Sequence, residues 1–400
     1  MTTTTAVAEI IESPAGRRAL AVQSPVFFDS YYCGMRFAAH RERWLGMIEK
    51  SRTSSLGRSQ KGAFLLLAPR DHGKTEACIS VTVRAICMDR NTRILWISES
   101  QGQAEKRMRR AKTVLESERI TTDWCSNPEL GMGAWRQTPE DRWMATQVYV
   151  SRGLHSVDPT LEAVGAGGSV TGGHFDMIIC DDLEDDRTTF SAAQRQKTRE
   201  WFRGTVRPML VKGGMLLVVG TRKHHDDLYG HFVDDPTFRI WEDKAITRFP
   251  ESHKFIYEKD DNGRETIIDV KVEGESEVLW PEERPIDYLL RERMATGNRL
   301  FNREFQNEIV DDESAAVRWD WLQAAMGRGA ALSLYELPDE QTAPGLDIVQ
   351  GWDFALVTDV HKAETRDTDY SVGITWGRDD NGVRYLLGIR RVRGLSQSRL

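Results

Sequence analysis

The chain has 400 residues, of which 40% are hydrophobic and 29% charged, and its formal net charge is −7. This length allows two domains with full-sized cores, and the composition is that of a globular protein rather than a disordered one. The negative balance excludes attraction of the whole surface to nucleic acid, so any DNA contact requires a local basic patch.

The N-terminal segment Met1–Pro14 lacks a basic region before an apolar stretch, so we do not expect a secretory signal. We expect residues 1–30 to form a mobile arm. No apolar run in the chain approaches the roughly 18 residues that a membrane-spanning helix needs. The five cysteines are scattered without the spacing of metal ligands or of a disulfide framework. This usage is typical of a reducing cytosol.

The segment Ala63–Glu76 reads as a short apolar strand that turns into a helix beginning near Gly73. In such a turn, backbone N–H groups and the helix N-terminus bind phosphate. The segment contains Gly-Lys-Thr at 73–75, as in the spacing G-x-x-x-x-G-K-[ST], although Ala68 replaces the first glycine. Lys74 would contact the β- and γ-phosphates and Thr75 would hold Mg²⁺. We therefore predict an ATP-binding loop here.

A basic helix follows the second strand, Arg93–Ser98. A solvated helix face is the favoured interpretation for any single arginine in it, and the alternatives are completion of a neighbouring subunit's ATP site and contact with DNA phosphates. The basic residues are Lys106, Arg107, Arg109, Arg110 and Lys112.

A second informative segment is the continuous apolar strand Phe175–Cys180, which runs directly into Asp181 and Asp182. A carboxylate at the C-terminal end of a parallel strand lies at the crevice where ligands bind. Asp181 would hold Mg²⁺, and either Asp182 or Glu184 would orient the water that attacks the γ-phosphate.

The following segments predict a helix, Ser191–Met209, and then a buried strand, Gly214–Gly220. Thr221 at the end of that strand would hydrogen-bond the γ-phosphate or its water and so sense hydrolysis. The alternative is an ordinary turn at the start of a helix.

Short alternating segments with a hairpin turn at Asp260–Gly263, followed by the helical segment Pro285–Gln306, predict a small subdomain over about 237–310. Residues 311–344 read as a linker. A new unit begins at 345 with a strand that carries Asp353, and Asp369 precedes a second strand. Arg384–Val392 would form the third.

Four segments together resemble the large terminase subunit of tailed bacteriophages: APRDHGKT, AVGAGGSVTGGHFDMIICDDLEDD, VVGTRKHHDDLYG and LWPEERPIDYLLRERMATGNRLFNREFQNE. The resemblance covers nearly the whole chain from about residue 30. Its most specific parts are GTR-x-H-x-x-DLYG and LWPE…F-x-x-E-x-Q, which general P-loop enzymes lack.

The resemblance implies ATP-driven translocation of viral double-stranded DNA into a procapsid, and cutting of the DNA by a C-terminal ribonuclease-H-like nuclease. It places Asp181 at the Mg²⁺ site and Thr221 in the motif that couples hydrolysis to movement. Asp353 and Asp369 would bind the nuclease metals, Mg²⁺ or Mn²⁺. The implied ATP-binding loop consists of Arg70, Asp71, His72, Gly73, Lys74 and Thr75.

The implied fold class is α/β. Residues 31–310 would form an additional-strand P-loop ATPase, with a mostly parallel sheet and helices on both faces. The strand that ends at Thr221 would insert between the phosphate-loop strand and the Asp181 strand. Residues 345–400 would be the opening strands of the nuclease domain, and we expect no complete nuclease because the later carboxylates would fall beyond Leu400.

The implied partners are double-stranded viral DNA, the portal protein, the small terminase subunit and further copies of the chain in a ring on the procapsid. The location would be the bacterial host cytoplasm, with no membrane. Two rival classes remain, a P-loop helicase or other DNA-remodelling ATPase, and a non-motor nucleotide-binding protein or small-molecule kinase.

Overall fold

The computed structural model divides the chain into two compact units, Met1–Val310 and Asp311–Leu400. It describes residues 10–55, 62–126, 133–136, 143–152, 157–168, 170, 172–189, 191–259, 264–309, 347–353, 371–378 and 384–392. Within these residues, no helix has both the length and the apolar character to cross a membrane.

The first unit is built on a seven-stranded sheet with the strand order β3-β4-β2-β5-β6-β1-β7. Every neighbouring pair is parallel except β3 and β4. The prediction of an α/β fold with β6 inserted between β1 and β5 is confirmed. The strands are β1 (Gly62–Leu67), β2 (Ile94–Ser98), β3 (Gln147–Val148), β4 (Leu161–Gly165), β5 (Phe175–Asp181), β6 (Leu210–Gly220) and β7 (Phe238–Glu242).

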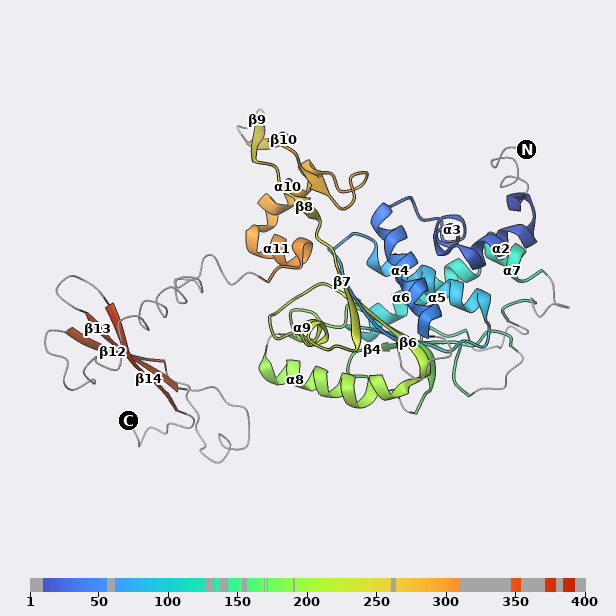
Figure 1. Cartoon of the computed structure of the whole chain (residues 1–400), viewed down its shortest axis with the longest axis horizontal. Coiled ribbons are helices and arrows are strands. Elements are labelled where there is room, and N and C mark those ends of the chain that lie inside the picture. Colours follow the sequence, from blue (N-terminus) through green and yellow to red (C-terminus); the bar gives the residue numbers. More distant parts are fainter. Residues whose placement is uncertain are drawn as a thin grey trace. The chain divides into compact units, whose positions relative to one another are not determined.

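Helices cover both faces of this sheet (Figure 1). Alternate strand residues face the two layers because successive side chains of a strand point to opposite sides. Phe64 packs with the helices of one layer and Leu65 with those of the other. The first layer holds α4 (Ala39–Ser55), α5 (Lys74–Met88), α6 (Gln101–Leu115) and α7 (Glu118–Trp124), and the second holds α8 (Ala192–Trp201) and α9 (Leu228–Val233).

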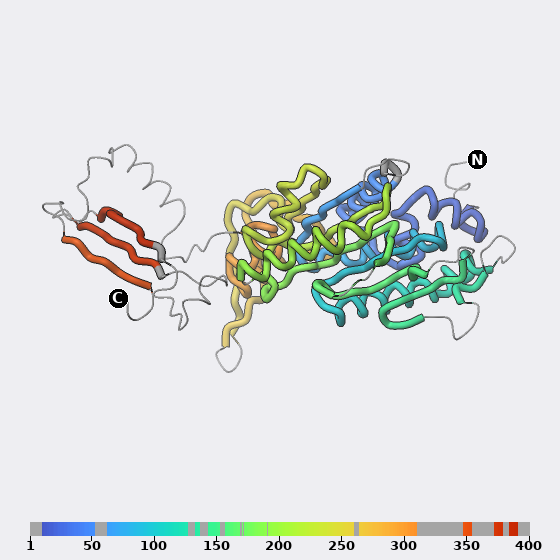
Figure 2. The backbone as a smooth tube through the Cα atoms, turned by 90° about the horizontal axis from the view of Figure 1, so that it is seen from below, coloured from blue at the N-terminus to red at the C-terminus, as the bar shows by residue number. Residues whose placement is uncertain are grey.

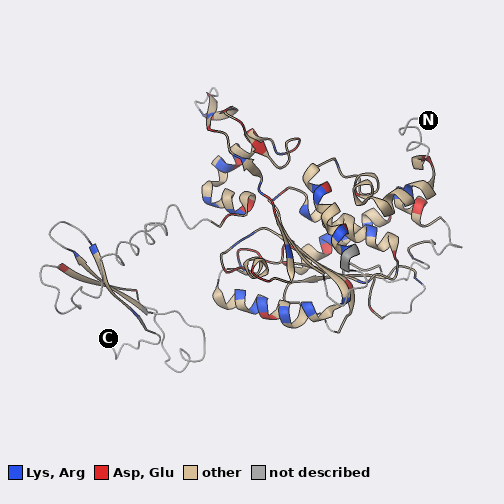
Figure 3. Ribbon diagram, in the orientation of Figure 1, with Lys and Arg blue, Asp and Glu red and all other residues tan. Residues whose placement is uncertain are grey.

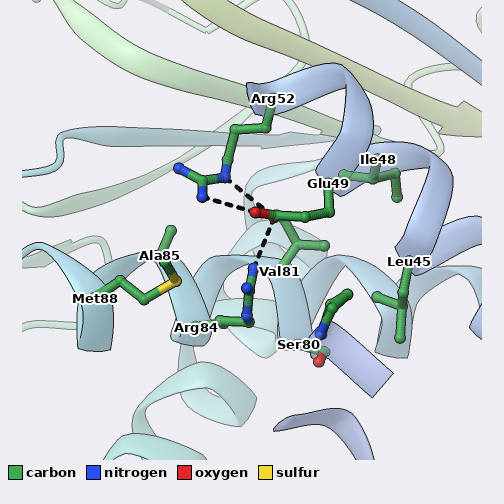
Figure 4. A pocket seen from close by; sticks show the side chains of 10 residues that line it. Leu45, Ile48, Glu49, Arg52, Ser80, Val81, Arg84, Ala85 and Met88 are labelled. Carbon is green, nitrogen blue, oxygen red and sulfur yellow. Dashed lines mark hydrogen bonds and ion pairs between the residues drawn. The ribbon is translucent and has the colours of Figure 1, made fainter. Parts of the chain in front are cut away.

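A partly buried charge cluster connects the phosphate-loop helix α5 to α4 (Figure 4). Arg84 on α5 donates to the Glu49 carboxylate at 2.7 Å, and Arg52 donates to the same carboxylate at 2.9 Å. The cavity beside this cluster has a volume of about 10 Å³, which is too small for any ligand larger than a single water. The cluster therefore stabilises helix packing.

The prediction of a mobile arm over residues 1–30 is wrong for the described part of that segment. Pro14–Gln23 forms α2 and Pro25–Tyr31 forms α3, and a serine side chain caps each helix directly before its proline. Phe28 is completely buried in the core. Arg17 also donates two hydrogen bonds to the buried Asp123 carboxylate, at 2.6 and 2.8 Å. These contacts fix α2 and α3 to the first helix layer.

The predicted helix Ser191–Met209 is α-helical only as far as Trp201. It continues as a π-helical turn, Phe202–Val206, and a 3₁₀ turn, Arg207–Met209. Pro208 lies in the last of these turns and has no N–H with which to continue an α-helix.

A small subdomain follows β7, and its predicted start at about residue 237 is too early. The segment Phe238–Glu242 is β7, which pairs in parallel with β1 and so belongs to the main sheet. Only Phe238 of this strand is buried, as expected at a sheet edge, where the sequence pattern of the strand is weak. We use the name small subdomain for β8 (Ile246–Arg248), β9 (Ser252–Lys259), β10 (Glu265–Glu273), β11 (Glu277–Val278), α10 (Ile286–Thr296) and α11 (Asn298–Gln306).

The predicted hairpin is confirmed, because β9 and β10 pair antiparallel. Figures 1 and 2 both show this hairpin projecting away from the main sheet of its unit. The predicted helical segment is divided into α10 and α11 at Gly297, whose φ of +80° suits glycine.

The second unit contains a three-stranded antiparallel meander, β12-β13-β14. Its strands are β12 (Asp347–Asp353), β13 (Ser371–Arg378) and β14 (Arg384–Val392). The three strands predicted for this region are therefore confirmed.

Candidate active site

Three neighbouring strands of the main sheet end at one cleft. The phosphate loop follows β1, Asp181 ends β5, and Thr221 follows β6, which lies between them. The cleft has a volume of about 760 Å³ and opens to solvent. Because the carboxyl ends of parallel strands meet at one edge of a sheet, the predicted residues are brought together although they are far apart in sequence.

The phosphate loop has the backbone that its sequence predicts. Gly73 caps α5 in the left-handed region, at φ +83°, and Lys74 is the first residue of the helix. Asp71 also has a positive φ, +59°, a conformation that costs a non-glycine residue of the order of 1 kcal/mol. The loop therefore places backbone N–H groups and the positive end of α5 at the cleft.

Lys74 joins the phosphate loop to the two neighbouring strand ends. Only 8% of this residue is exposed. Its Nζ donates to the Thr221 hydroxyl at 2.8 Å and lies 3.4 Å from an Asp182 carboxylate oxygen. The Thr221 hydroxyl in turn donates to the Ala68 carbonyl at 3.1 Å. Thr221 is therefore positioned to respond to whatever Lys74 binds.

Asp181 faces the start of α5 from the end of β5. The Thr75 hydroxyl lies 3.0 and 3.1 Å from the two oxygens of the Asp181 carboxylate. Burial and the neighbouring Asp182 charge raise the pKa of Asp181 to about 6, against the opposing effect of Arg107 and Lys74.

The hydroxyl and carboxylate oxygens of Thr75 and Asp181 are the hard ligands that Mg²⁺ prefers, and Mg²⁺ commonly takes its remaining ligands from water and substrate phosphates. The two residues therefore fit such an ion. Within the described residues, no group of three or more His, Cys, Asp or Glu side chains is placed to hold a metal by itself.

Arg107 is a residue of this site that the sequence analysis did not single out. It lies on α6, and its Nε donates to the Asp181 carboxylate at 2.9 Å. Its side chain is 29% exposed and lines the cleft. The favoured interpretation of a solvated helix face is therefore wrong for Arg107. The signal was the basic helix itself, but its partner lies 74 positions away in the chain.

Asp182 and Glu184, the two carboxylates left open by the sequence, have different surroundings. The Asp182 side chain is 36% exposed and faces Lys74, and its backbone φ is +50°. Glu184 is 2% exposed, and one of its oxygens accepts the Leu228 N–H at the start of α9, at 2.7 Å. Its other oxygen is buried and has no hydrogen-bond partner among the described residues. Asp182 is the more accessible of the two.

Burial raises the pKa of Glu184 to about 7. A carboxyl group whose pKa is higher in the folded state stabilises the protein at low pH, and this stability is lost as the pH rises toward 7. We therefore expect Glu184→Gln to raise the free energy of unfolding at pH 8 by about 3 kcal/mol. Denaturant unfolding at pH 8 and pH 5 would measure this difference in the free energy of unfolding. At pH 5 most of the gain in stability should disappear. An equal gain at both pH values would contradict burial of a charge.

The remaining loop residues divide between the cleft and its support. Arg70 and Asp71, two of the predicted ATP-binding residues, line the cleft. His72 was predicted to bind ATP, and because its side chain is completely buried, only its backbone could contact a nucleotide. Its Nδ1 donates to the Arg70 carbonyl at 2.7 Å, and burial lowers its pKa to about 4. A neutral His72 therefore supports the loop from inside.

The small subdomain supplies one wall of the cleft, which the sequence analysis did not predict. The signals were the two segments noted for their specificity, LWPE and F-x-x-E-x-Q, because the wall residues lie in or between them. These residues are Trp280, Arg284, Leu300, Arg303 and Glu304.

In the second unit, the structure does not assemble a nuclease site among the described residues. Asp353 is an exposed residue at the end of β12, in register with Val372 of β13. Asp369 lies outside the described residues.

Comparison with protein-family models gives no match, and comparison with curated proteins gives none either. Among solved structures, the chain is similar to the large terminase of bacteriophage HK97, at 14% identity and a TM-score of 0.41, over 90% of this chain and 63% of that one. It is also similar to the ATPase domain of the large terminase of Thermus phage P74-26, at 15% identity and a TM-score of 0.37, over 65% and 93% of the two chains. A third similar structure is the large terminase of a thermophilic bacteriophage in complex with ADP, at 10% identity and a TM-score of 0.37, over 89% and 68%. The chain thus spans less than two thirds of the HK97 protein.

Proposed function

We propose that this chain is the ATPase of a viral DNA-packaging motor, a large terminase subunit that uses ATP hydrolysis to move double-stranded DNA into a procapsid. One observation carries the proposal. The Lys74 ammonium from the phosphate loop lies within 3.4 Å of both Asp182 after β5 and Thr221 after β6. The segments that supply these residues are the ones that carry the terminase resemblance.

In the proposed reaction, water attacks the γ-phosphorus of ATP and the bond to the β–γ bridging oxygen breaks, giving ADP and phosphate. Lys74 and the N–H groups of the loop bind the β- and γ-phosphates and stabilise the charge that develops on them. Asp182 orients the attacking water and accepts its proton. Mg²⁺ held by Thr75 and Asp181 would supply further neutralisation of the phosphate charge.

Thr221 is the proposed sensor of hydrolysis. Its hydroxyl accepts from Lys74 and donates to Ala68, so it contacts the phosphate loop at both ends. Loss of the γ-phosphate would change the position of Lys74, and that change would reach the end of β6 through this hydrogen bond.

Contact with duplex DNA requires a local basic patch, because the chain is negative overall. Figure 3 shows Lys and Arg recurring along α8. Arg195 and Arg199 of this helix are paired with Asp226, whereas Lys197 is exposed. We propose α8 as part of the DNA-contacting surface. Portal protein, small terminase subunit, ring assembly and the host cytoplasm belong to the same proposal, as do nuclease roles for Asp353 and Asp369.

The test is ATP hydrolysis with and without duplex DNA, measured as phosphate release. We expect turnover that increases with duplex DNA and requires no free strand end. Separation of a forked duplex would instead favour a helicase, and hydrolysis that does not respond to DNA would favour a non-motor nucleotide-binding protein. Absence of hydrolysis under all of these conditions would contradict the proposal.

A further inference from the structure

We propose that α11 is the coupling element of this ATPase, and that Glu304 is the positioning residue through which the loops of the cleft are linked to the small subdomain. This inference rests on the proposed ATPase function. It assigns a role to F-x-x-E-x-Q, the segment Phe301–Gln306, for which the catalytic machinery described above has no use.

Glu304 holds two of the cleft loops at once. Its backbone carbonyl accepts the Arg70 N–H of the phosphate loop at 2.8 Å. Its carboxylate accepts two hydrogen bonds from Lys223 Nζ, at 2.7 and 2.8 Å. Lys223 lies two residues after Thr221, in the loop that follows β6. Glu304 is 5% exposed, so this ion pair is largely removed from solvent.

The third cleft loop, which follows β5, is joined to α11 by Arg303, the residue before Glu304. Arg303 lies 2.9 Å from an Asp186 carboxylate oxygen, in the loop after β5, and 3.0 Å from the Glu304 carboxylate. The loops after β1, β5 and β6 therefore all contact one turn of α11. These are the loops that carry the proposed phosphate-binding, water-orienting and sensing residues.

The other side of α11 is fixed to the small subdomain. The Gln306 side chain exchanges two hydrogen bonds with the backbone of Ile246 at the start of β8, each 2.9 Å long. The Ala245 N–H donates to the Phe305 carbonyl at 2.8 Å. Phe301 and Phe305 pack in a separate hydrophobic cluster with Ala245, Ile246 and Leu289. A shift of α11 must therefore move β8 and α10 with it.

The cleft loops are connected to α11, and α11 is connected to the rest of the small subdomain. A change at Thr221 or in the phosphate loop reaches Glu304 through hydrogen bonds, and Gln306 and the phenylalanines transfer it to the small subdomain. Energetic coupling between sites travels through such contiguous packed and hydrogen-bonded groups, and the physical test is whether the far element responds to ligand at the near site. The ion pair is largely buried, with the Lys223 and Glu304 side chains 17% and 7% exposed, so removing one partner should weaken this connection.

The experiment compares hydrogen–deuterium exchange of the full chain with and without a non-hydrolysable ATP analogue. In the parent chain we expect the analogue to protect both the phosphate loop and the segment from α10 to α11. Glu304→Gln keeps the size of the side chain and removes its charge. In this variant the ion pair with Lys223 is lost while the backbone hydrogen bond to Arg70 remains. We therefore expect protection of the phosphate loop to remain and the response of α10 and α11 to be reduced.

A kinetic readout accompanies the exchange measurement. We expect Glu304→Gln to lower kcat about tenfold while the Kd of the analogue changes less than about twofold. The matched control is Glu275→Gln, which removes a carboxylate of the same subdomain that pairs with Arg248 at the surface, 86% exposed. This control should retain the response of α10 and α11.

If Glu304→Gln fails to fold, as judged by circular dichroism, Lys223→Gln tests the same ion pair from the other partner. An unchanged response of α10 and α11 in whichever variant folds would overturn the role of Glu304. Failure of the parent chain to bind the analogue would instead contradict the proposed ATPase function, so that the two failures are distinguishable.

Discussion

Replacing Lys74 with Ala is expected to lower ATP turnover by about 10²- to 10³-fold, the loss typical of removing one preorganised group that stabilises transition-state charge. The ammonium group is held in place before any ligand binds, by Thr221 at 2.8 Å and Asp182 at 3.4 Å. Its position at the start of α5 also adds its charge to that of the helix N-terminus. Steady-state phosphate release would measure the loss, and a fluorescent ATP analogue would measure binding.

Lys212→Ala is a matched control for this variant. Lys212 is exposed near the beginning of β6, the same strand that leads to Thr221 at its other end. We expect the ATP turnover of the Lys212→Ala variant to stay close to that of the parent chain. Because the buried Lys74 pairs with a carboxylate, the thermal stability of Lys74→Ala must be measured alongside its activity. A folded Lys74→Ala protein with parental turnover would remove the central assignment of the site.

The part of the site that could be predicted from the sequence depends on contacts along or between regular strands. The phosphate loop is continuous in the chain, so its strand and the helix that begins near Gly73 could be predicted together. Asp181 and Thr221 each follow a buried apolar strand, and parallel strands bring such ends to one edge of a sheet. Their approach to the start of α5 follows from the order of the strands.

The parts that could not be predicted depend on contacts between distant segments with no periodic signal. Arg107 contacts a carboxylate 74 positions away, and Lys223 one 81 positions away. Nothing in a single basic or acidic residue specifies its partner, and most charged residues of this kind are solvated. The burial of the His72 ring was also not predicted, since a polar residue in a functional loop suggests side-chain contact with ligand although this ring supports the loop from within.

The N-terminal helices carried a local signal that the sequence analysis did not use. Ser13-Pro14 and Ser24-Pro25 each combine a preferred cap residue with proline at the first helical position. What makes these helices part of the core is the pairing of Arg17 and Tyr32 with the buried Asp123, and that pairing spans about a hundred residues. The caps of α2 and α3 could therefore be predicted from the sequence, whereas the packing of these helices against the first helix layer could not.

The two carboxylates near the cleft provide the second large expected effect. Asp182→Asn should lower kcat by about 10²- to 10³-fold, because an amide cannot accept the proton of the attacking water. The substitution suits the site, since Asn tolerates the left-handed backbone that Asp182 adopts at φ +50°. Binding of ATP should be retained, because the charge that is lost is negative and faces the phosphates.

Glu184→Gln provides the comparison within the same loop. Its carboxyl group accepts the Leu228 N–H and is 2% exposed, and a Gln side chain can accept the same hydrogen bond. We therefore expect a loss of turnover of less than about tenfold, against at least about a hundredfold for Asp182→Asn. Single-turnover hydrolysis at saturating ATP would separate the chemical step from binding. The reverse order of the two losses would assign water activation to Glu184, and the cost of burying its charge at neutral pH would then be a cost of catalysis rather than of loop packing.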